Sequence, residues 1–186
     1  MRIFLAVFPP PAVQDAAAAV IDRLRRPGDG VSWVKHQNLH YTVRFLGELG
    51  ESGLERVTEA AREGVAGRRR FEAVLGEAGA FPNAARANVL WLGLAEGGEG
   101  LSALAESVER ALRRLRFDRA AHAFTPHLTL GRVRARGQDW SARLAGVSVE
   151  PDPPARFVVD RVSVVESTLS PKGSRYDVRA DALLGE

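Results

Sequence analysis

Hydrophobic residues along the chain recur with two spacings, and these separate predicted helices from predicted strands. Between residues 52 and 66 apolar residues recur every three or four positions, as on one face of a helix, and 100–115 repeats this pattern. Shorter stretches rich in β-branched and aromatic residues are typical of strands. Helices are therefore predicted over 13–25, 52–66, 100–115 and 140–144. Strands are predicted over 2–8, 31–34, 39–46, 71–75, 89–94, 127–133, 157–165 and 176–178.

The order of these predicted elements is similar in the two halves of the chain. Each half supplies at least one long helix and one strand that carries the same short polar motif. Because amphipathic helices and strands must bury their apolar faces against other elements, we expect two α+β lobes that face each other across a cleft. No stretch resembles a linker, and the proline-rich stretch 151–154 is expected to be a connecting loop. The chain is thus predicted to be one domain, residues 1–186, made of two intertwined lobes.

The repeated motif is histidine, an apolar residue, threonine, and a second apolar residue. It reads His40-Tyr41-Thr42-Val43 in the first half and His127-Leu128-Thr129-Leu130 in the second. Alternate side chains of a strand point the same way, so the histidine and threonine of each motif are predicted to share one face. Two such strands side by side would place two imidazoles and two hydroxyls on one surface.

This set of groups suits the cleavage of a phosphorus–oxygen bond. One imidazole can take a proton from water while the other gives a proton to the leaving oxygen, and the usual histidine pKa allows both near neutral pH. The hydroxyls of Thr42 and Thr129 can donate to phosphate oxygens on which charge develops. A single histidine on a strand is more often structural. Two in matched contexts, His40 and His127, favour a catalytic pair.

Arginines and aromatic residues near the motifs are further candidates for substrate contacts. Strict alternation places Arg44 on the histidine face of its strand and Arg132 on the opposite face, although Gly131 would permit a bulge that redirects Arg132. Aromatic residues at strand ends belong either to the core or to a surface on which bases stack. The aromatic candidates are Phe8, Trp33, Phe81 and Tyr176.

Composition narrows the picture further. The 186 residues contain no cysteine, which excludes disulfides, thiolate zinc sites and a cysteine nucleophile. The net charge is +3, and nearly all the positive side chains are arginines, which bind phosphate well. A GC-rich genome would produce the same excess of arginine over lysine. The first ten residues lack the features of a signal peptide and no apolar run is long enough to cross a membrane, so a cytoplasmic protein with no membrane partner is expected.

Several other site types have no matching sequence pattern. The metal motif HExxH, carboxylates next to the two motifs, and the nucleophile motif GxSxG are absent, so we expect neither a metal nor a cofactor. Gly97-Gly98-Glu99-Gly100 lacks the Lys-Ser/Thr of a phosphate loop and is predicted to be a turn. His36 and His122 lack the threonine partner and are expected on the surface or in loops.

The chain resembles the 2H phosphoesterases, and more closely the RNA 2′,3′-cyclic phosphodiesterase family, also called the 2′-5′ RNA ligase family. The resemblance covers nearly the whole chain and depends on both complete motifs in their wider contexts. The segments that carry it are Arg2-Ile3-Phe4-Leu5-Ala6-Val7, Asn38-Leu39-His40-Tyr41-Thr42-Val43-Arg44-Phe45-Leu46-Gly47-Glu48, Val89-Leu90-Trp91-Leu92-Gly93, Phe124-Thr125-Pro126-His127-Leu128-Thr129-Leu130-Gly131-Arg132, Glu166-Ser167, Gly173 and Tyr176.

The resemblance implies a fold, an activity and roles for particular residues. The fold would be α+β and bilobal, with two pseudo-symmetric lobes whose antiparallel sheets line a central cleft and whose helices lie outside. The activity would be metal-independent hydrolysis of a 2′,3′-cyclic phosphate at an RNA end, for example of a tRNA fragment, to a 2′-phosphate, with 2′-5′ ligation as the reverse reaction. His40 would be the acid and His127 the base, although near symmetry leaves this order open. Thr42, Thr129 and Arg132 would bind the phosphate.

Two alternatives remain open at this point. The first is an esterase that acts on small cyclic nucleotides or on 2′-5′ oligonucleotides. The second is a non-catalytic RNA-binding protein of the same fold, although such a protein has no chemical need for both histidines. No coiled-coil pattern is present, and a monomer is expected.

Overall fold

The computed structural model describes residues 1–135, 137–146, 155–171 and 173–186. The helices are α1 (Pro11–Leu24), α2 (Glu51–Val65), α3 (Gly98–Arg114) and α4 (Ser141–Ala145), with two short 3₁₀ helices, η1 (His36–Asn38) and η2 (Ala84–Arg86). The strands are β1 (Arg2–Val7), β2 (Val31–Trp33), β3 (Tyr41–Glu48), β4 (Phe71–Phe81), β5 (Val89–Glu96), β6 (Leu128–Val133), β7 (Arg156–Val159), β8 (Arg161–Ser170) and β9 (Gly173–Leu183).

Within the described residues these strands form one continuous antiparallel sheet. Its order is β7-β4-β5-β6-β3-β1-β8-β9, and β2 pairs with β6 beside this path. The order is nearly symmetric about its centre. Strands β6 and β3 lie in the middle, β5 and β1 flank them, and β4 and β8 come next. This arrangement confirms the predicted α+β fold with two pseudo-symmetric halves, and it places the two motif strands side by side.

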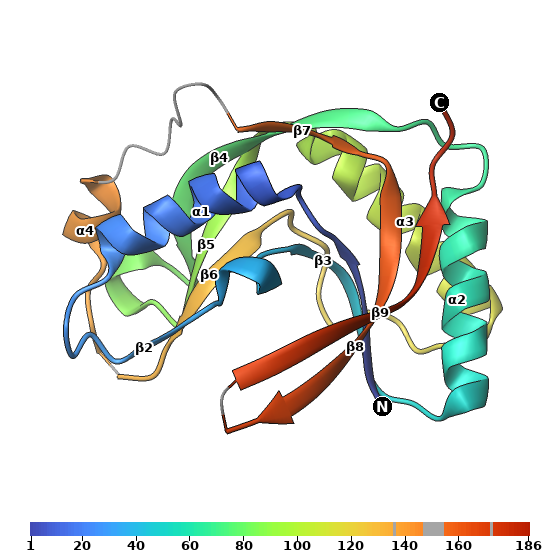
Figure 1. Cartoon of the computed structure of the whole chain (residues 1–186), viewed down its shortest axis with the longest axis horizontal. Coiled ribbons are helices and arrows are strands. Elements are labelled where there is room, and N and C mark those ends of the chain that lie inside the picture. The colour runs from blue at the N-terminus through green and yellow to red at the C-terminus, as the bar shows by residue number, and fades with distance from the viewer. Residues whose placement is uncertain (136, 147–154, 172) are drawn as a thin grey trace.

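The helices lie outside the sheet (Figure 1). Helices α2 and α3 pack against each other, and α2 also contacts β8 and β9. Helix α1 contacts β6 and η1. The hairpin of β8 and β9 extends away from the body of the molecule and leaves an open angle beneath β2 (Figure 1). No helix among the described residues is both long and apolar enough to cross a membrane.

The two faces of β1 show how the sheet separates core from cleft. Ile3, Leu5 and Val7 point into the main hydrophobic core, where each is almost fully buried. Phe4 and Ala6 point the other way and form a second, small cluster, against which Tyr176 packs. The alternation of side chains along β1 therefore supplies the core on one side and an aromatic wall on the other.

All four predicted helices are confirmed to within two residues at each end. The stretch Gly97-Gly98-Glu99-Gly100, predicted to be a turn, is corrected in part: Gly97 is a left-handed cap with φ of 85°, and α3 begins at Gly98. A residue with positive φ directly before a helix favours glycine, which has no Cβ to strain. The stretch 151–154 lies outside the described residues.

The predicted strands need larger corrections. The strand predicted over 157–165 is two strands, because the chain turns at Asp160 and passes from β4 at one end of the sheet to β1 in the other half. Strands β4 and β9 are both longer than predicted. Strand propensity measures how well a residue fits a pleated surface and does not identify the partner strand, so these boundaries depend on tertiary pairing.

The first motif strand begins one residue after its histidine. Asn38 ends η1, and its side-chain amide donates to the Ser174 carbonyl oxygen across 2.8 Å. The carbonyl of Asn38 accepts a hydrogen bond from the ring of His40 at 2.6 Å. These bonds hold residues 38–40 outside the ladder, so β3 starts at Tyr41 instead of residue 39. It then continues to Glu48, two residues beyond the end predicted at residue 46.

Candidate active site

The two motifs meet at the centre of the sheet. Strands β3 and β6 pair through Tyr41 and Leu128, the residues that directly follow His40 and His127. Antiparallel pairing at this point places each histidine near the threonine of the other motif. The tyrosine and leucine point into the core and are fully buried. The motif side chains predicted to share a surface are therefore brought together by one strand pair.

A cleft of about 800 Å³ opens beside this pair. Among the described residues that line it, all the charged side chains are cationic, which makes the cleft a site for an anion. His40, Thr42, Thr129, Arg132 and Tyr176, all predicted site residues, lie in its wall, and Trp33 does too. Other lining residues that the sequence analysis did not single out include Arg2, Phe4, Lys35, Asn38, Phe45, Arg134, Ser167 and Ser174.

His40 is held by a defined set of contacts. Its Nδ1 lies 2.6 Å from the Asn38 carbonyl oxygen, which can only accept, so Nδ1 carries a proton. In the neutral ring Nε2 is then unprotonated and accepts from the Thr42 hydroxyl across 2.9 Å. The ring of His40 packs among three aromatic rings, Phe4, Phe8 and Tyr176, whose centroids lie 5.1 to 5.4 Å away.

This enclosure keeps His40 neutral. Burial lowers the pKa of His40 from 6.5 to about 4, against the bond to Asn38, which favours the charged form. The nearby charges of His127 and Arg132 lower the pKa of His40 further. At neutral pH the free protein therefore presents an unprotonated Nε2, which can accept a proton.

His127 is oriented in the same way but is less enclosed. Its Nδ1 donates to the Thr125 carbonyl oxygen at 2.8 Å, two residues upstream, as His40 does to Asn38. The ring of Phe81 packs edge-on against it, with the centroids 5.1 Å apart. His127 does not itself line the cleft, but its own strand neighbour Thr129 does. Both histidines thus have Nδ1 fixed and Nε2 available for chemistry.

Matching bulges in the two motif strands decide which later residues reach the cleft. In β6, Trp91 pairs with Thr129 and Leu90 with Gly131, so Leu130 is an extra residue. The bulge places Arg132 on the same side as Thr129, and both line the cleft. From the sequence we expected that a bulge at Gly131 could redirect Arg132, and the structure has such a bulge one residue earlier, at Leu130.

The bulge in β3 has the opposite consequence for Arg44. Leu5 pairs with Arg44 and Ala6 with Thr42, so Val43 is the extra residue. Arg44, predicted on the histidine face, points instead toward α3 and bonds Glu109 at 2.9 Å. Phe45 lines the cleft where Arg44 was expected, and the Phe45 residue is 49% exposed. The prediction that Arg44 contacts substrate finds no geometric support, because the inserted residue reverses the alternation.

The aromatic candidates divide into two groups. Phe8 and Phe81 pack on the imidazoles of the two histidines and do not line the cleft. Tyr176 and Trp33 do line it. Burial raises the pKa of Tyr176, with Arg132 and Arg2 acting in the opposite direction, so its hydroxyl stays protonated and can donate.

The remaining histidines lie away from the cleft. His36 lies in η1 and its Nε2 is 2.6 Å from Asp15, while His122 is exposed in a loop. Both placements agree with the sequence analysis. No group of three or more metal-ligating side chains is found in the part of the chain that the structure describes.

Of the lining residues that were missed, Asn38 and Phe45 had a sequence signal, since both lie within the segment that carries the family resemblance. Arg2 lies in another such segment, but Lys35 and Arg134 gave no signal, because a cation near a strand end is usually a solvated surface residue. Their convergence on one cleft depends on the pairing of β2 with β6 and on the path of the β8–β9 hairpin.

The fold and the two adjacent His-x-Thr strands define the 2H phosphoesterase class. Within it, the chain belongs to the 2′-5′ RNA ligase superfamily, which it matches over residues 9–170. It is 34% identical over 177 residues to a protein of Methanothermobacter thermautotrophicus named RNA 2′,3′-cyclic phosphodiesterase, covering 95% of both chains. A Thermotoga maritima protein of the same name is 32% identical, covering 96% of this chain and 92% of its own.

Solved structures agree on the fold. The structure of TT0787 from Thermus thermophilus superposes with a TM-score of 0.81 at 29% identity, covering 100% of both chains. E. coli LigT complexed with 3′-AMP superposes with a TM-score of 0.74 at 23% identity, covering 100% of this chain and 98% of LigT.

Proposed function

We propose that this protein hydrolyses the 2′,3′-cyclic phosphate at an RNA end to a 2′-phosphate. The observation that carries the proposal is the pair of fixed imidazoles beside a cleft whose charged lining residues are all cationic. The names of the relatives support the same substrate class. A cyclic phosphate diester carries one negative charge. In this proposal Arg132 and Thr129, which line the cleft, stabilise the further charge of the transition state.

In this reaction water attacks phosphorus and the bond from phosphorus to the 3′ oxygen breaks. One group must take a proton from water and another must protonate the 3′ oxygen. The resemblance assigns the acid to His40, but its aromatic enclosure and a pKa of about 4 favour the reverse order. We therefore assign His40 Nε2 as the base and His127 Nε2 as the acid. The Thr42 hydroxyl, which donates to Nε2 in the free protein, is free to turn to a phosphate oxygen when water takes its place.

The first experiment incubates a short RNA ending in a 2′,3′-cyclic phosphate with the protein in excess EDTA and identifies the position of the product phosphate. A 2′-phosphate is expected. His40→Ala and His127→Ala should each lower the rate by roughly 10²–10⁴-fold. His36→Ala is the matched control, because His36 lies outside the cleft and pairs with Asp15, and it should keep the wild-type rate. A full rate in His40→Ala would overturn the proposal.

The acid and base roles can be separated with a cyclic substrate whose 3′ bridging oxygen is replaced by sulfur. A thiolate leaves without protonation, because its pKa of about 8.5 is far below that of an alcohol. This substrate should restore much of the activity of His127→Ala and none of that of His40→Ala. The opposite pattern would return the acid role to His40.

The same groups can serve 2′-5′ ligation, in which a 5′-hydroxyl replaces water in the reverse direction. The superfamily that the chain matches is named for 2′-5′ RNA ligation, which is the reason to test this reaction. Loss of ligation in both His→Ala variants is expected if one site serves both reactions.

A further inference from the structure

The aromatic side chains that border the cleft differ in how much of each ring is open to a ligand. Phe4 is 4% exposed, and it packs together with Tyr176 against the ring of His40. Phe45 is 49% exposed. Within the described part of the chain, no other aromatic ring lies against Phe45. Its ring is therefore the open aromatic surface on this wall of the cleft.

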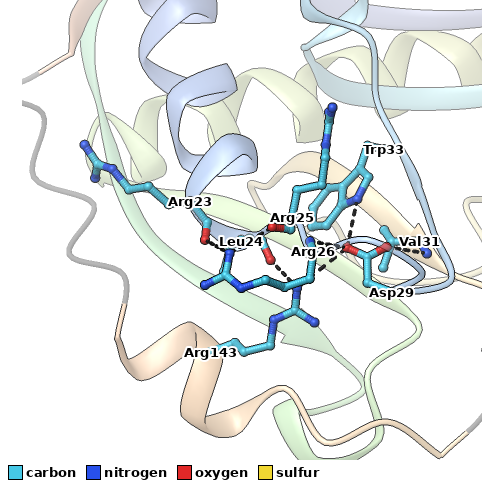
Figure 2. Close-up of polar contacts among 8 residues, drawn as sticks. All are labelled: Arg23, Leu24, Arg25, Arg26, Asp29, Val31, Trp33 and Arg143. Atoms are coloured by element: carbon cyan, nitrogen blue, oxygen red, sulfur yellow. Dashed lines mark hydrogen bonds and ion pairs between the residues drawn. The ribbon is translucent and has the colours of Figure 1, made fainter.

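Trp33 also borders the cleft, but its indole belongs to the core face of the sheet. Trp33 pairs with Gly131, and Gly131 pairs in turn with the fully buried Leu90. The indole Nε1–H donates to the Asp29 carboxylate across 3.2 Å (Figure 2). The indole ring packs edge-on against the buried Trp140, with the centroids 6.0 Å apart. These contacts engage the indole with the protein interior, so it offers no face to a ligand.

Strand register places Phe45 next to the motif threonine on the same face of β3. Because Val43 is the extra residue of the bulge, Phe45 is the cleft-facing residue that follows Thr42, and it pairs with Phe4 on β1. Successive residues on one face of a strand lie about 6.6 Å apart. In a nucleotide the ribose separates the base from the phosphate. A base bound at Phe45 can therefore belong to the same nucleotide as a phosphate bound at Thr42.

The direction of the two motif strands decides which part of the nucleotide lies toward Phe45. Strands β3 and β6 are antiparallel where they pair, so residues that follow Thr42 lie at the same end of the motif pair as His127. Phe45 is thus at the His127 end, and Arg132 is at the His40 end. In the proposed reaction His127 protonates the 3′ oxygen and water attacks from the opposite side of phosphorus. The ribose and its base therefore lie at the end that holds Phe45.

Arg2 accompanies the exposed ring. Its guanidinium carbon lies over the ring of Phe45, 5.6 Å from the centroid, and a cation at this distance is attracted to the electron-rich face. Its carboxylate partner Glu48 is 3.9 Å away and lies closer, at 3.2 Å, to the N-terminal ammonium group of Met1. Arg2 pairs with Ser167, and both line the cleft. The pair therefore supplies hydrogen-bond donors beside the ring.

We propose that Phe45 is the platform on which the base of the terminal nucleotide stacks while its cyclic phosphate lies between the two motifs. The proposal rests on the proposed function and extends it from the phosphate group to the nucleoside that carries it. Every base has a π-face, so stacking on one aromatic ring recognises a base without selecting a particular one. Phe45 contacts the substrate in this scheme, whereas Arg2 is a positioning residue that acts through the ring.

The test compares adenosine 2′,3′-cyclic phosphate with its abasic analogue, in which a hydrogen atom replaces the adenine. The measured quantity is the ratio of kcat/KM for the nucleotide to kcat/KM for the analogue. The wild-type ratio should be well above one, and Phe45→Ala should lower it roughly tenfold, through KM for the nucleotide. Phe45→Tyr keeps the aromatic ring and should keep the ratio. Phe45→Leu keeps an apolar side chain without a ring and should lower the ratio nearly as much as Phe45→Ala.

Val178→Ala is the matched control. Val178 is on the same register row as Phe45, since Phe45 pairs with Phe4, Phe4 with Val165, and Val165 with Val178. It is 54% exposed, but it is not among the described residues that line the cleft. Val178→Ala should therefore keep the wild-type ratio. A fall as large as that of Phe45→Ala would show that the ratio reports exposed apolar surface in general, which would overturn the proposal.

The positioning role is tested by a double-mutant cycle with Arg2→Gln, which removes the charge and keeps part of the aliphatic chain. Arg2→Gln should lower the ratio about threefold in the wild-type background and have no further effect in Phe45→Ala. Equal losses in the two backgrounds would show that Arg2 does not act through the ring.

The outcomes separate the two proposals. If the wild-type protein hydrolyses neither substrate, the proposed function fails. If it hydrolyses both with equal kcat/KM, or if Phe45→Ala lowers both equally, the cyclic phosphodiesterase activity stands and the base-stacking role of Phe45 is overturned.

Discussion

Three aromatic rings enclose His40, and this enclosure sets the pH range over which the imidazole can accept a proton. If His40 is the base, kcat/KM should stay high below pH 6 and fall on the acid side with an apparent pKa of about 4. A pH profile measured by initial rates checks this. Phe8→Ala, which opens the enclosure without changing a lining residue, should move the acid limb toward 6.5. A wild-type limb already near 6.5 would contradict the assignment.

Gly131 shows how a residue without a side chain supports the site. A Cβ there would lie 2.7 Å from Val31 Cγ1 and 2.9 Å from the indole of Trp33, which Asp29 prevents from moving away. Gly131→Ala should therefore destabilise the protein by about 1–3 kcal/mol in urea unfolding and lower kcat/KM. Gly98→Ala is the control, since nothing lies within 4 Å of a Cβ there, and it should be neutral or slightly stabilising. Equal stability of the two variants would argue against a rigid Trp33.

Among the strands, the two bulges explain why similar motifs end in different residues. The extra residue follows the threonine in both β3 and β6, so the third residue after each threonine reaches the cleft: Phe45 in one strand and Arg132 in the other. Side-chain alternation alone assigns Arg44 to the cleft and Arg132 to the opposite face. A bulge reverses both assignments, because it shifts the alternation by one residue.

The two arginines therefore make a matched pair of variants. Arg132→Ala should lower kcat/KM by roughly 10²–10³-fold, the usual cost of losing a donor to transition-state charge. Arg44→Ala should keep kcat/KM close to wild type and lose about 1–3 kcal/mol of stability, because Arg44 joins β3 to α3 through Glu109. Steady-state kinetics and urea unfolding of both variants check the prediction. A large kinetic effect of Arg44→Ala would contradict the geometry of the bulge.

For the molecule as a whole, the enclosure of His40 links activity to acid stability. The folded-state pKa of about 4 is below the unfolded value of 6.5, so between these values the unfolded chain binds more protons. The stability that a neutral His40 permits is complete above pH 6.5 and is lost as the pH falls toward 4, by about 3 kcal/mol in total. Urea unfolding at pH 7 and pH 4.5 measures it. His40→Gln should show a smaller fall over this interval, and an equal fall would assign the acid sensitivity to other groups.

The helices, the two motifs and the class of fold follow from the amino-acid order without any knowledge of strand partners. They depend on local periodicity and on residue types that carry chemistry. The four helices agree with the structure to within two residues because amphipathic spacing is a property of one segment. The matched contexts of His40 and His127 likewise indicated a pair, and the structure brings the two strands together.

Which side chains share the cleft, in contrast, depends on how the assembled sheet pairs its strands. The bulge at Val43, which brings Phe45 to the cleft in place of Arg44, depends on how β3 pairs with β1. The cationic lining depends on β2 and the β8–β9 hairpin bordering the same cleft. The pKa of His40 follows from burial among Phe4, Phe8 and Tyr176, all of which lie far from it along the chain. Register, burial and long-range contacts arise only when distant segments come together. For this reason the position of Arg44 could not be read from the motif pattern.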